Sequence, residues 1–129
     1  MKKIFLNWVL VIFWMAVIYY FSHQPNLGSG LEPLWDLIFR KIAHVAEYFV
    51  LAYLLFRAFQ SHGFKPSKAL IFTAILAIMY AGFDEWHQSF ISMREGKILD
   101  VLVDSVGIFI FVILNFNIYG KNLSNSQPL

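Results

Sequence analysis

The chain has 129 residues, of which 59% are hydrophobic, 19% aromatic and only 14% charged, and its formal net charge is +2. A soluble domain of this size buries only about two-thirds of the surface of its unfolded chain, so it could not hide this much apolar surface from water. The small net charge gives no support for a nucleic-acid partner, and the lack of cysteine excludes disulfides and thiolate chemistry.

The first apolar run covers residues 4–21 and follows Lys2 and Lys3. About 20 apolar residues cross a bilayer, so this run predicts a transmembrane helix. A cleaved signal peptide is the alternative, but its apolar core is usually about 7–15 residues long and ends at a small-residue cleavage site. Because this run is longer and the following FSHQP offers no such site, we favour an uncleaved helix.

A turn-rich loop separates this run from residues 31–42, where an apolar helical face that includes Trp35 alternates with charged residues. This pattern is typical of a short helix lying in the membrane interface. Further apolar runs predict three more transmembrane helices, and a polar tail is expected to be disordered. The spans are about 4–21, 43–59, 69–87 and 98–116, and the tail is 117–129.

The predicted fold is therefore all-α: a four-transmembrane-helix bundle with a short interfacial helix before the second span, forming one domain over residues 1–129. Four spans place both termini on one side of the membrane. Six Lys and Arg residues lie on that side and four on the other, so the positive-inside rule places both termini in the cytoplasm. All eight acidic residues fall on the outer half, and we interpret this placement as functional because acids contribute little to topology.

Ionisable and amide side chains gather at the predicted outer ends of the spans. His44 and Glu47 are three residues apart and share a helical face, and the topology brings the other sets to a similar depth. A charged group near the bilayer centre costs about 2.5–3.5 kcal/mol, so such groups must pair or line a cavity, and by default they are candidates for function. Those able to act as acid, base or nucleophile are His44, Glu47, Asp84, Glu85 and His87.

A metal site is an alternative use of the same residues. Imidazole and carboxylate groups suit Zn²⁺ or Mn²⁺, and the candidate ligands are His44, Glu47 and His87. The H-E-x-x-H spacing of many zinc enzymes is missing from the sequence, so a divalent metal stays one option among several, and no other cofactor is predicted. A polar network that only ties the helices together is a further alternative.

Several short motifs recur in a fixed order on the alternating apolar runs. They are F-S-x-Q at 21–24, K-x-x-H-x-x-E-Y at 41–48, D-E-x-x-Q at 84–88, R-x-G at 94–96, D-V at 100–101, and Gly107. In this order they resemble the VanZ-like family of bacterial membrane proteins over residues 21–112. The sequence departs from the family pattern at His23, where Ser is common, at Ser92-Met93, where Pro-Gly is frequent, and at Asp104, where Asn is usual.

The resemblance implies a multi-pass protein of the bacterial cell membrane, in a family whose founding member is linked to resistance to the glycopeptide teicoplanin. We expect an outer-face polar pocket that binds or modifies a lipid-linked envelope molecule, or binds a lipidated glycopeptide. A membrane-embedded hydrolase or transferase is the runner-up, and proton movement ranks last because the inner halves of the spans have no carboxylate. The predicted ligand-binding residues are Ser22, Gln24, Lys41, Gln88, Arg94, Asp100 and Asp104.

Overall fold

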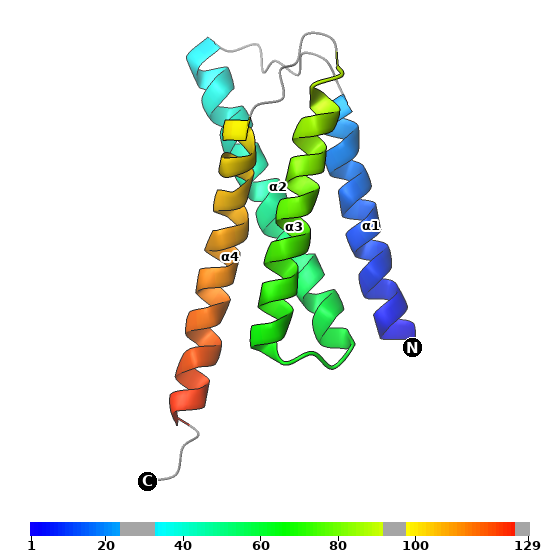
Figure 1. Cartoon of the computed structure of the whole chain (residues 1–129), viewed down its shortest axis with the longest axis vertical. Helices are drawn as coiled ribbons and strands as arrows, with labels where there is room; N and C mark the ends of the chain where they lie inside the picture. The colour runs from blue at the N-terminus through cyan, green and yellow to red at the C-terminus, as the bar shows by residue number, and fades with distance from the viewer. Residues whose placement is uncertain (24–32, 92–97, 126–129) are drawn as a thin grey trace.

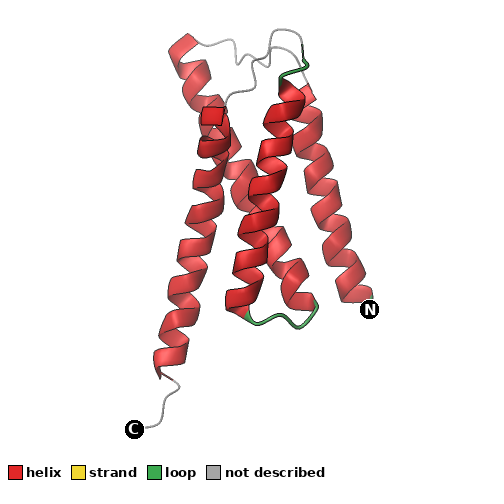
Figure 2. Cartoon of the chain, in the orientation of Figure 1, coloured by secondary structure: helices red, strands yellow, loops and turns green. Residues whose placement is uncertain are grey.

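The computed structural model describes residues 1–23, 33–91 and 98–125, and this part of the chain is almost entirely helical (Figure 1; Figure 2). Each of its four helices contains a stretch long and apolar enough to cross a membrane. The helices are α1 (Lys2–His23), α2 (Pro33–Ser61), α3 (Pro66–Gln88) and α4 (Ile98–Asn125). The prediction of an all-α bundle of four transmembrane helices is confirmed.

The outer surface of the bundle is apolar, as lipid requires. With 22 and 23 residues, α1 and α3 are about 33 Å long at 1.5 Å per residue, which matches the roughly 30 Å thickness of the hydrocarbon core. At most a third of the apolar stretch of any helix is buried inside the protein. Large side chains such as Phe5, Ile71 and Ile113 point outward, where they contact lipid tails instead of water.

α2 and α3 form the centre of the bundle, because each packs against all three other helices, and α2 makes the more extensive contact with α1. α1 and α4 lie on opposite sides of the α2–α3 pair and do not contact each other in the described residues (Figure 1). A tight hairpin joins α2 to α3: Gly63 has φ +81°, a left-handed conformation that favours glycine, and Pro66 opens α3. The other end of the bundle, which we call the site end, therefore carries the C-terminal ends of α1 and α3 and the N-terminal ends of α2 and α4.

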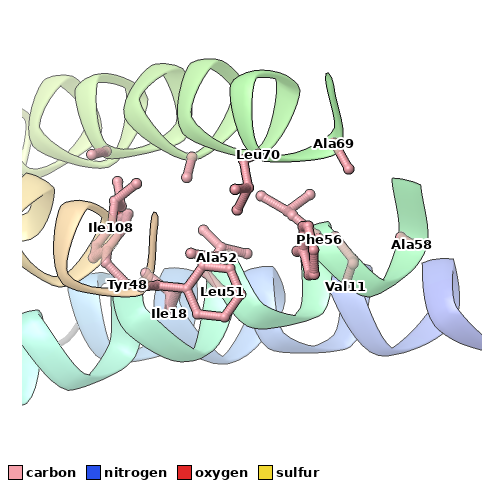
Figure 3. Packing of buried hydrophobic residues seen from close by; sticks show 14 residues of the cluster. Val11, Ile18, Tyr48, Leu51, Ala52, Phe56, Ala58, Ala69, Leu70 and Ile108 are labelled. Carbon is pink, nitrogen blue, oxygen red and sulfur yellow. The ribbon is translucent and has the colours of Figure 1, made fainter. Parts of the chain in front are cut away.

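The core runs along α2 and receives side chains from every helix (Figure 3). Leu51 and Leu55 of α2 are fully buried against Ile18 of α1 and Ile108 of α4. Several of the buried positions hold alanine. These alanines have no exposed surface, and small residues allow membrane helices to approach each other closely. These alanines are Ala52, Ala58, Ala69, Ala77 and Ala81.

Two hydrogen bonds from aromatic side chains hold α1 against its neighbours. Trp14 Nε1 donates to the main-chain oxygen of Glu47 over 2.9 Å, and Tyr80 Oη donates to the main-chain oxygen of Met15 over 2.6 Å. The bonded residues are 33 and 65 positions apart in the sequence. Apolar contacts between helices give little stabilisation over contacts with lipid, so such bonds help to fix which faces meet.

The helix boundaries differ from the sequence prediction in two places. Residues 33–42, expected in a separate interfacial helix, continue into the second span without a break, so that α2 has 29 residues. After Pro33, which opens the helix, no proline or glycine interrupts this stretch, and the charged residues that lower its hydropathy do not disfavour helix. α4 likewise continues to Asn125, past residue 117 where the disordered tail was expected to begin.

Candidate functional site

Four ionisable side chains meet between three helices near the site end. His44 comes from α2, Asp84 and Glu85 from the last turns of α3, and Asp104 from the second turn of α4. One possible ligand atom from each lies within 4.8 Å of those of the other three. We call these four residues the polar cluster.

The polar cluster is buried. Asp84 is 1% exposed, Glu85 5% and Asp104 0%, and only His44 is half-buried. His44 Nδ1 and Asp104 Oδ1 are 2.8 Å apart, a close hydrogen-bonded pair between α2 and α4. The second oxygens, Asp84 Oδ1 and Asp104 Oδ2, have no hydrogen-bond partner in the described part of the chain.

Neutral polar side chains surround the carboxyl group of Asp84. Tyr48 Oη donates to Asp84 Oδ2 over 3.3 Å, and Ser22 lies near this carboxyl group. Gln88 Nε2 in turn donates to Ser22 Oγ over 3.2 Å. Tyr48 follows His44 by four residues and Gln88 follows Asp84 by four, so helical periodicity places each pair on one face.

The parallel helices α2 and α4 are joined by successive cross-links. Lys41 Nζ forms an ion pair with Asp100 at the outermost position, and the His44–Asp104 pair follows one turn deeper. One further turn along, Gly107 lies against the α2 backbone: a Cβ there would overlap the Val45 carbonyl oxygen. Gly107 therefore allows the close approach of the helices that brings Asp104 to His44.

An apolar groove opens beside these cross-links, between α2 and α4. Its volume is about 560 Å³, and the Lys41–Asp100 ion pair forms its polar edge. Its apolar lining comes from residues that face outward into the membrane, so a lipid chain has lateral access to it. The lining residues are Leu37, Leu99, Leu102, Val103 and Val106.

The other predicted site residues lie elsewhere. Glu47 is half-buried on α2 outside the polar cluster, and its main-chain oxygen accepts the Trp14 hydrogen bond. His87 lies at the α1–α3 contact, where its ring stacks on Tyr19 with centroids 4.5 Å apart and on His23 at 5.4 Å. The remaining two, Gln24 and Arg94, fall outside the described residues.

Sequence reasoning gave no role to Tyr48, although it touches Asp84. The available signal was the K-x-x-H-x-x-E-Y spacing, which places Tyr48 one turn below His44 on the same face. Glu47, its chain neighbour, lies about 100° from Tyr48 around the helix and is not among the four side chains of the polar cluster. Of the last two residues of this motif, the tyrosine and not the carboxylate contacts the polar cluster.

This arrangement supports two kinds of chemistry. Buried charged groups are stable only when they are paired or bind a metal ion, and here an imidazole and three carboxyl groups face one small volume. They provide acid and base groups at hydrogen-bond distance, and they also provide a set of N and O atoms suited to a divalent cation.

Comparisons with known proteins agree with the membrane fold. The sequence model of the VanZ/LLP1 family matches residues 5–119. An uncharacterized membrane protein of Bacillus subtilis (strain 168), YwnJ, is 34% identical over 102 residues, which cover 74% of this chain and 66% of that protein. The chain thus spans just under two-thirds of this relative's length. No solved structure matches the chain.

Proposed function

The chain belongs to the VanZ/LLP1 family, and we propose that this multi-pass membrane protein binds an anionic, lipid-linked molecule of the cell envelope at the site end of the bundle. The observation that carries the proposal is the groove between α2 and α4 with the Lys41–Asp100 ion pair at its edge. An amphiphile in this position would have its chain against leucine and valine and its headgroup beside charged side chains.

The dimensions and polarity of the groove support such a ligand. Ligand sites are usually about 300–1,000 Å³, mostly apolar, with a few polar groups that fix orientation. The groove has a volume in this range and an apolar lining, and it is shallow and open along the surface of the bundle. The Lys41 ammonium group would contact a phosphate or carboxylate, and Asp100 would accept hydrogen bonds from sugar or peptide groups. Arg94, six residues before Asp100 in the sequence, would add a planar fork of donors for the same anion.

A second candidate function is hydrolysis of, or group transfer from, the bound headgroup. The observation that favours it is the position of the His44–Asp104 pair one helical turn from the Lys41–Asp100 pair. His44 would protonate the leaving group, and Asp84 or Glu85 would accept a proton from the attacking water or acceptor. The test is release of inorganic phosphate or transfer of the headgroup from an isoprenoid phosphate by purified protein. Absence of turnover with parent protein, with or without divalent metal, would eliminate the enzyme and leave the binding protein.

We also propose that both termini lie in the cytoplasm of a bacterial cell, so that the site end faces outward. The excess of Lys and Arg at the terminal end supports this orientation, and the ligand is then an outer-leaflet molecule or a lipidated glycopeptide such as teicoplanin. Reporter fusions after Gln60 and after Asn125 should both be active in the cytoplasm. Activity of either fusion only outside the cell would reverse the orientation.

Photo-crosslinking tests the binding site directly. The parent protein in lipid nanodiscs should be labelled by a photoactivatable isoprenoid phosphate in preference to a photoactivatable phosphatidylcholine, with the label on α2 or α4. Lys41→Met should weaken labelling about 10–100-fold, because a hydrogen bond to a charged group contributes about 1.5–3 kcal/mol. The matched control is Arg40→Met, since Arg40 is the adjacent cation and pairs with Asp36 on the surface of α2.

Two outcomes would contradict the binding proposal. Labelling that is equal for both lipids would mean that the groove only accommodates bulk lipid. Equal loss in the Lys41→Met and Arg40→Met variants would mean that general surface charge, not the ion pair, attracts the probe. Protein levels in the membrane are measured in parallel, because a purely structural network would lower the amount of folded protein instead of binding. Teicoplanin susceptibility of cells expressing the parent and Lys41→Met chains then tests the link to resistance.

A further inference from the structure

We propose that the polar cluster is a binding site for one divalent metal ion, Mn²⁺ or Zn²⁺, with His44, Asp84, Glu85 and Asp104 as its ligands. The fold brings the ligands together, since each of three helices contributes at least one of them. The four residues do not form a short metal-binding motif in the sequence. The proposal concerns the interior of the bundle and does not depend on what occupies the groove on its surface.

The spacing of the ligand atoms is close to that of a metal shell. At metal–ligand bonds of about 2.1 Å, neighbouring ligand atoms are about 3.4 Å apart in the tetrahedral geometry usual for Zn²⁺, and about 3.0 Å (neighbours) to 4.2 Å (opposite) apart in an octahedral shell. The four candidate atoms lie within 4.8 Å of one another, and His44 Nδ1 and Asp104 Oδ1 are 2.8 Å apart. A small inward movement of the side chains would bring the set to these spacings.

The unpartnered oxygens point to a positive ligand. Asp84 Oδ1 and Asp104 Oδ2 are buried and accept no hydrogen bond from any described residue, while both side chains are at most 1% exposed. A buried carboxylate without a partner is costly, and the common solutions are a paired cation or a coordinated metal. Within the described ranges, the basic side chain at hydrogen-bond distance from these carboxylates is His44, and a neutral imidazole is a common metal ligand.

Groups around the cluster are placed as outer-shell partners usually are. Tyr48 Oη holds Asp84 Oδ2, so this carboxylate would orient its other oxygen, Oδ1, toward an ion. Such hydrogen bonds fix the orientation of ligating carboxylates and affect metal affinity. The site is also closed to water on most sides, since only His44 of the four ligands is appreciably exposed.

The donor set decides which ions are expected. Three carboxylates and one imidazole suit Mn²⁺ and Zn²⁺ better than soft, thiolate-preferring ions, and the imidazole disfavours Ca²⁺ and Mg²⁺. This set differs from the ligands that the sequence suggested. His44 is common to both, but Asp84, Glu85 and Asp104 take the places of Glu47 and His87.

Metal content and metal-dependent stability test the proposal. Protein purified in mild detergent without chelator should carry about one Mn²⁺ or Zn²⁺ per chain by elemental analysis. After treatment with EDTA, its unfolding temperature should rise and saturate at one equivalent of MnCl₂ or ZnCl₂, but not of MgCl₂ or CaCl₂. Mn²⁺ bound to the parent should show nitrogen coupling from one imidazole in pulsed electron paramagnetic resonance, and His44→Gln should remove it.

Asp104→Asn separates a metal site from a structural network. Its metal affinity should fall by more than the about 10–100-fold that loss of an outer-shell partner alone causes. Without metal the same variant should be at least as stable as the parent, because asparagine can still accept a hydrogen bond from His44 and removes a buried charge. A structural network predicts lower stability at every metal concentration. If Asp104→Asn does not fold, Asp84→Asn provides the same comparison.

The matched control is Asp36→Asn, which removes a carboxylate from α2 outside the cluster, where it pairs with Arg40 at 3.2 Å. It should leave metal binding unchanged. The proposal is overturned if the parent binds no Mn²⁺ or Zn²⁺ at 100 µM, or if Asp36→Asn weakens binding as much as Asp104→Asn. Because lipid labelling is measured separately, failure of the groove ligand and failure of the metal site can be told apart.

Discussion

Replacing Gly107 with alanine perturbs the contact between α2 and α4 at one atom. Gly107 is buried. An added Cβ would overlap the carbonyl oxygen of Val45 and lie 3.0 Å from the amide nitrogen of Phe49. Both neighbours are backbone atoms of α2, so they cannot move aside as a flexible side chain would. Carbon contacts are optimal at about 3.5–4.0 Å, so α4 must retreat by on the order of 1 Å.

The expected cost has two parts. Overpacking of a tight contact costs about 1–3 kcal/mol. The His44–Asp104 hydrogen bond, 2.8 Å long and one turn away, would stretch beyond hydrogen-bond range, and loss of a bond to a charged group costs about 1.5–3 kcal/mol. Alanine regains about 1 kcal/mol of helix propensity. We therefore expect Gly107→Ala to lower the free energy of unfolding by about 1.5–5 kcal/mol.

Gly82→Ala is the matched control, because a Cβ at Gly82 in α3 meets no atom within 4 Å. Denaturation of both variants in mixed detergent micelles, followed by circular dichroism, measures the difference. Gly82→Ala should be neutral or stabilised by up to about 1 kcal/mol. If Gly107→Ala is as stable as Gly82→Ala, the close α2–α4 contact does not exist as described, and the His44–Asp104 pair loses its structural basis.

Three further substitutions test other contacts by the same denaturation assay. Tyr80→Phe removes the 2.6 Å bond to the Met15 main-chain oxygen and should cost about 1 kcal/mol; no loss would show that α1 does not depend on this bond. Gly63→Ala strains a residue with φ +81° and should cost about 1–2 kcal/mol, and a neutral result would argue against the hairpin geometry. Phe111→Ala empties a site where Phe49 and Phe56 pack edge-on at 5.6 Å. Phe111→Ala should lower the free energy of unfolding by about 3 kcal/mol, the lower end of the range for buried aromatic residues, because the side chain is still in lipid when the protein is unfolded. A loss below about 1 kcal/mol would contradict this packing.

The number and type of the helices could be predicted because lipid imposes a simple rule: each span must satisfy its own backbone hydrogen bonds and be apolar for about 20 residues. The continuity of α2 could not be predicted in this way. Hydropathy falls at Arg40 and Lys41 because these residues approach the headgroups, but a helix does not end where the membrane ends. The drop in hydropathy therefore marks where the helix leaves the apolar part of the membrane, and it does not mark the end of the helix.

The convergence of three spans at one depth followed from the topology, which is why His44, Asp84, Glu85 and Asp104 were among the candidates. Which carboxylate faces inward depends on helix rotation, and rotation is fixed by packing. Gly107 and Trp14 determine it here, through a close approach to Val45 and a hydrogen bond to the main chain of Glu47. Gly107 belongs to the family motifs, but neither the motif nor Trp14 shows which face of the partner helix it contacts, so Glu47 and His87 could not be separated from the cluster beforehand.

The parallel pairing of α2 with α4 has a consequence for synthesis in the cell. Chains emerge from the ribosome N-terminal end first, and their parts fold in that order, so α1, α2 and the α3 hairpin enter the bilayer before α4 exists. Until Asp104 arrives, the imidazole of His44 has no acceptor from α4 and the carboxylates at the end of α3 border on lipid. A chain stalled before Ile98 is a three-helix protein that presents these polar groups to the membrane. Insertion of the last helix therefore completes the polar cluster and encloses its side chains.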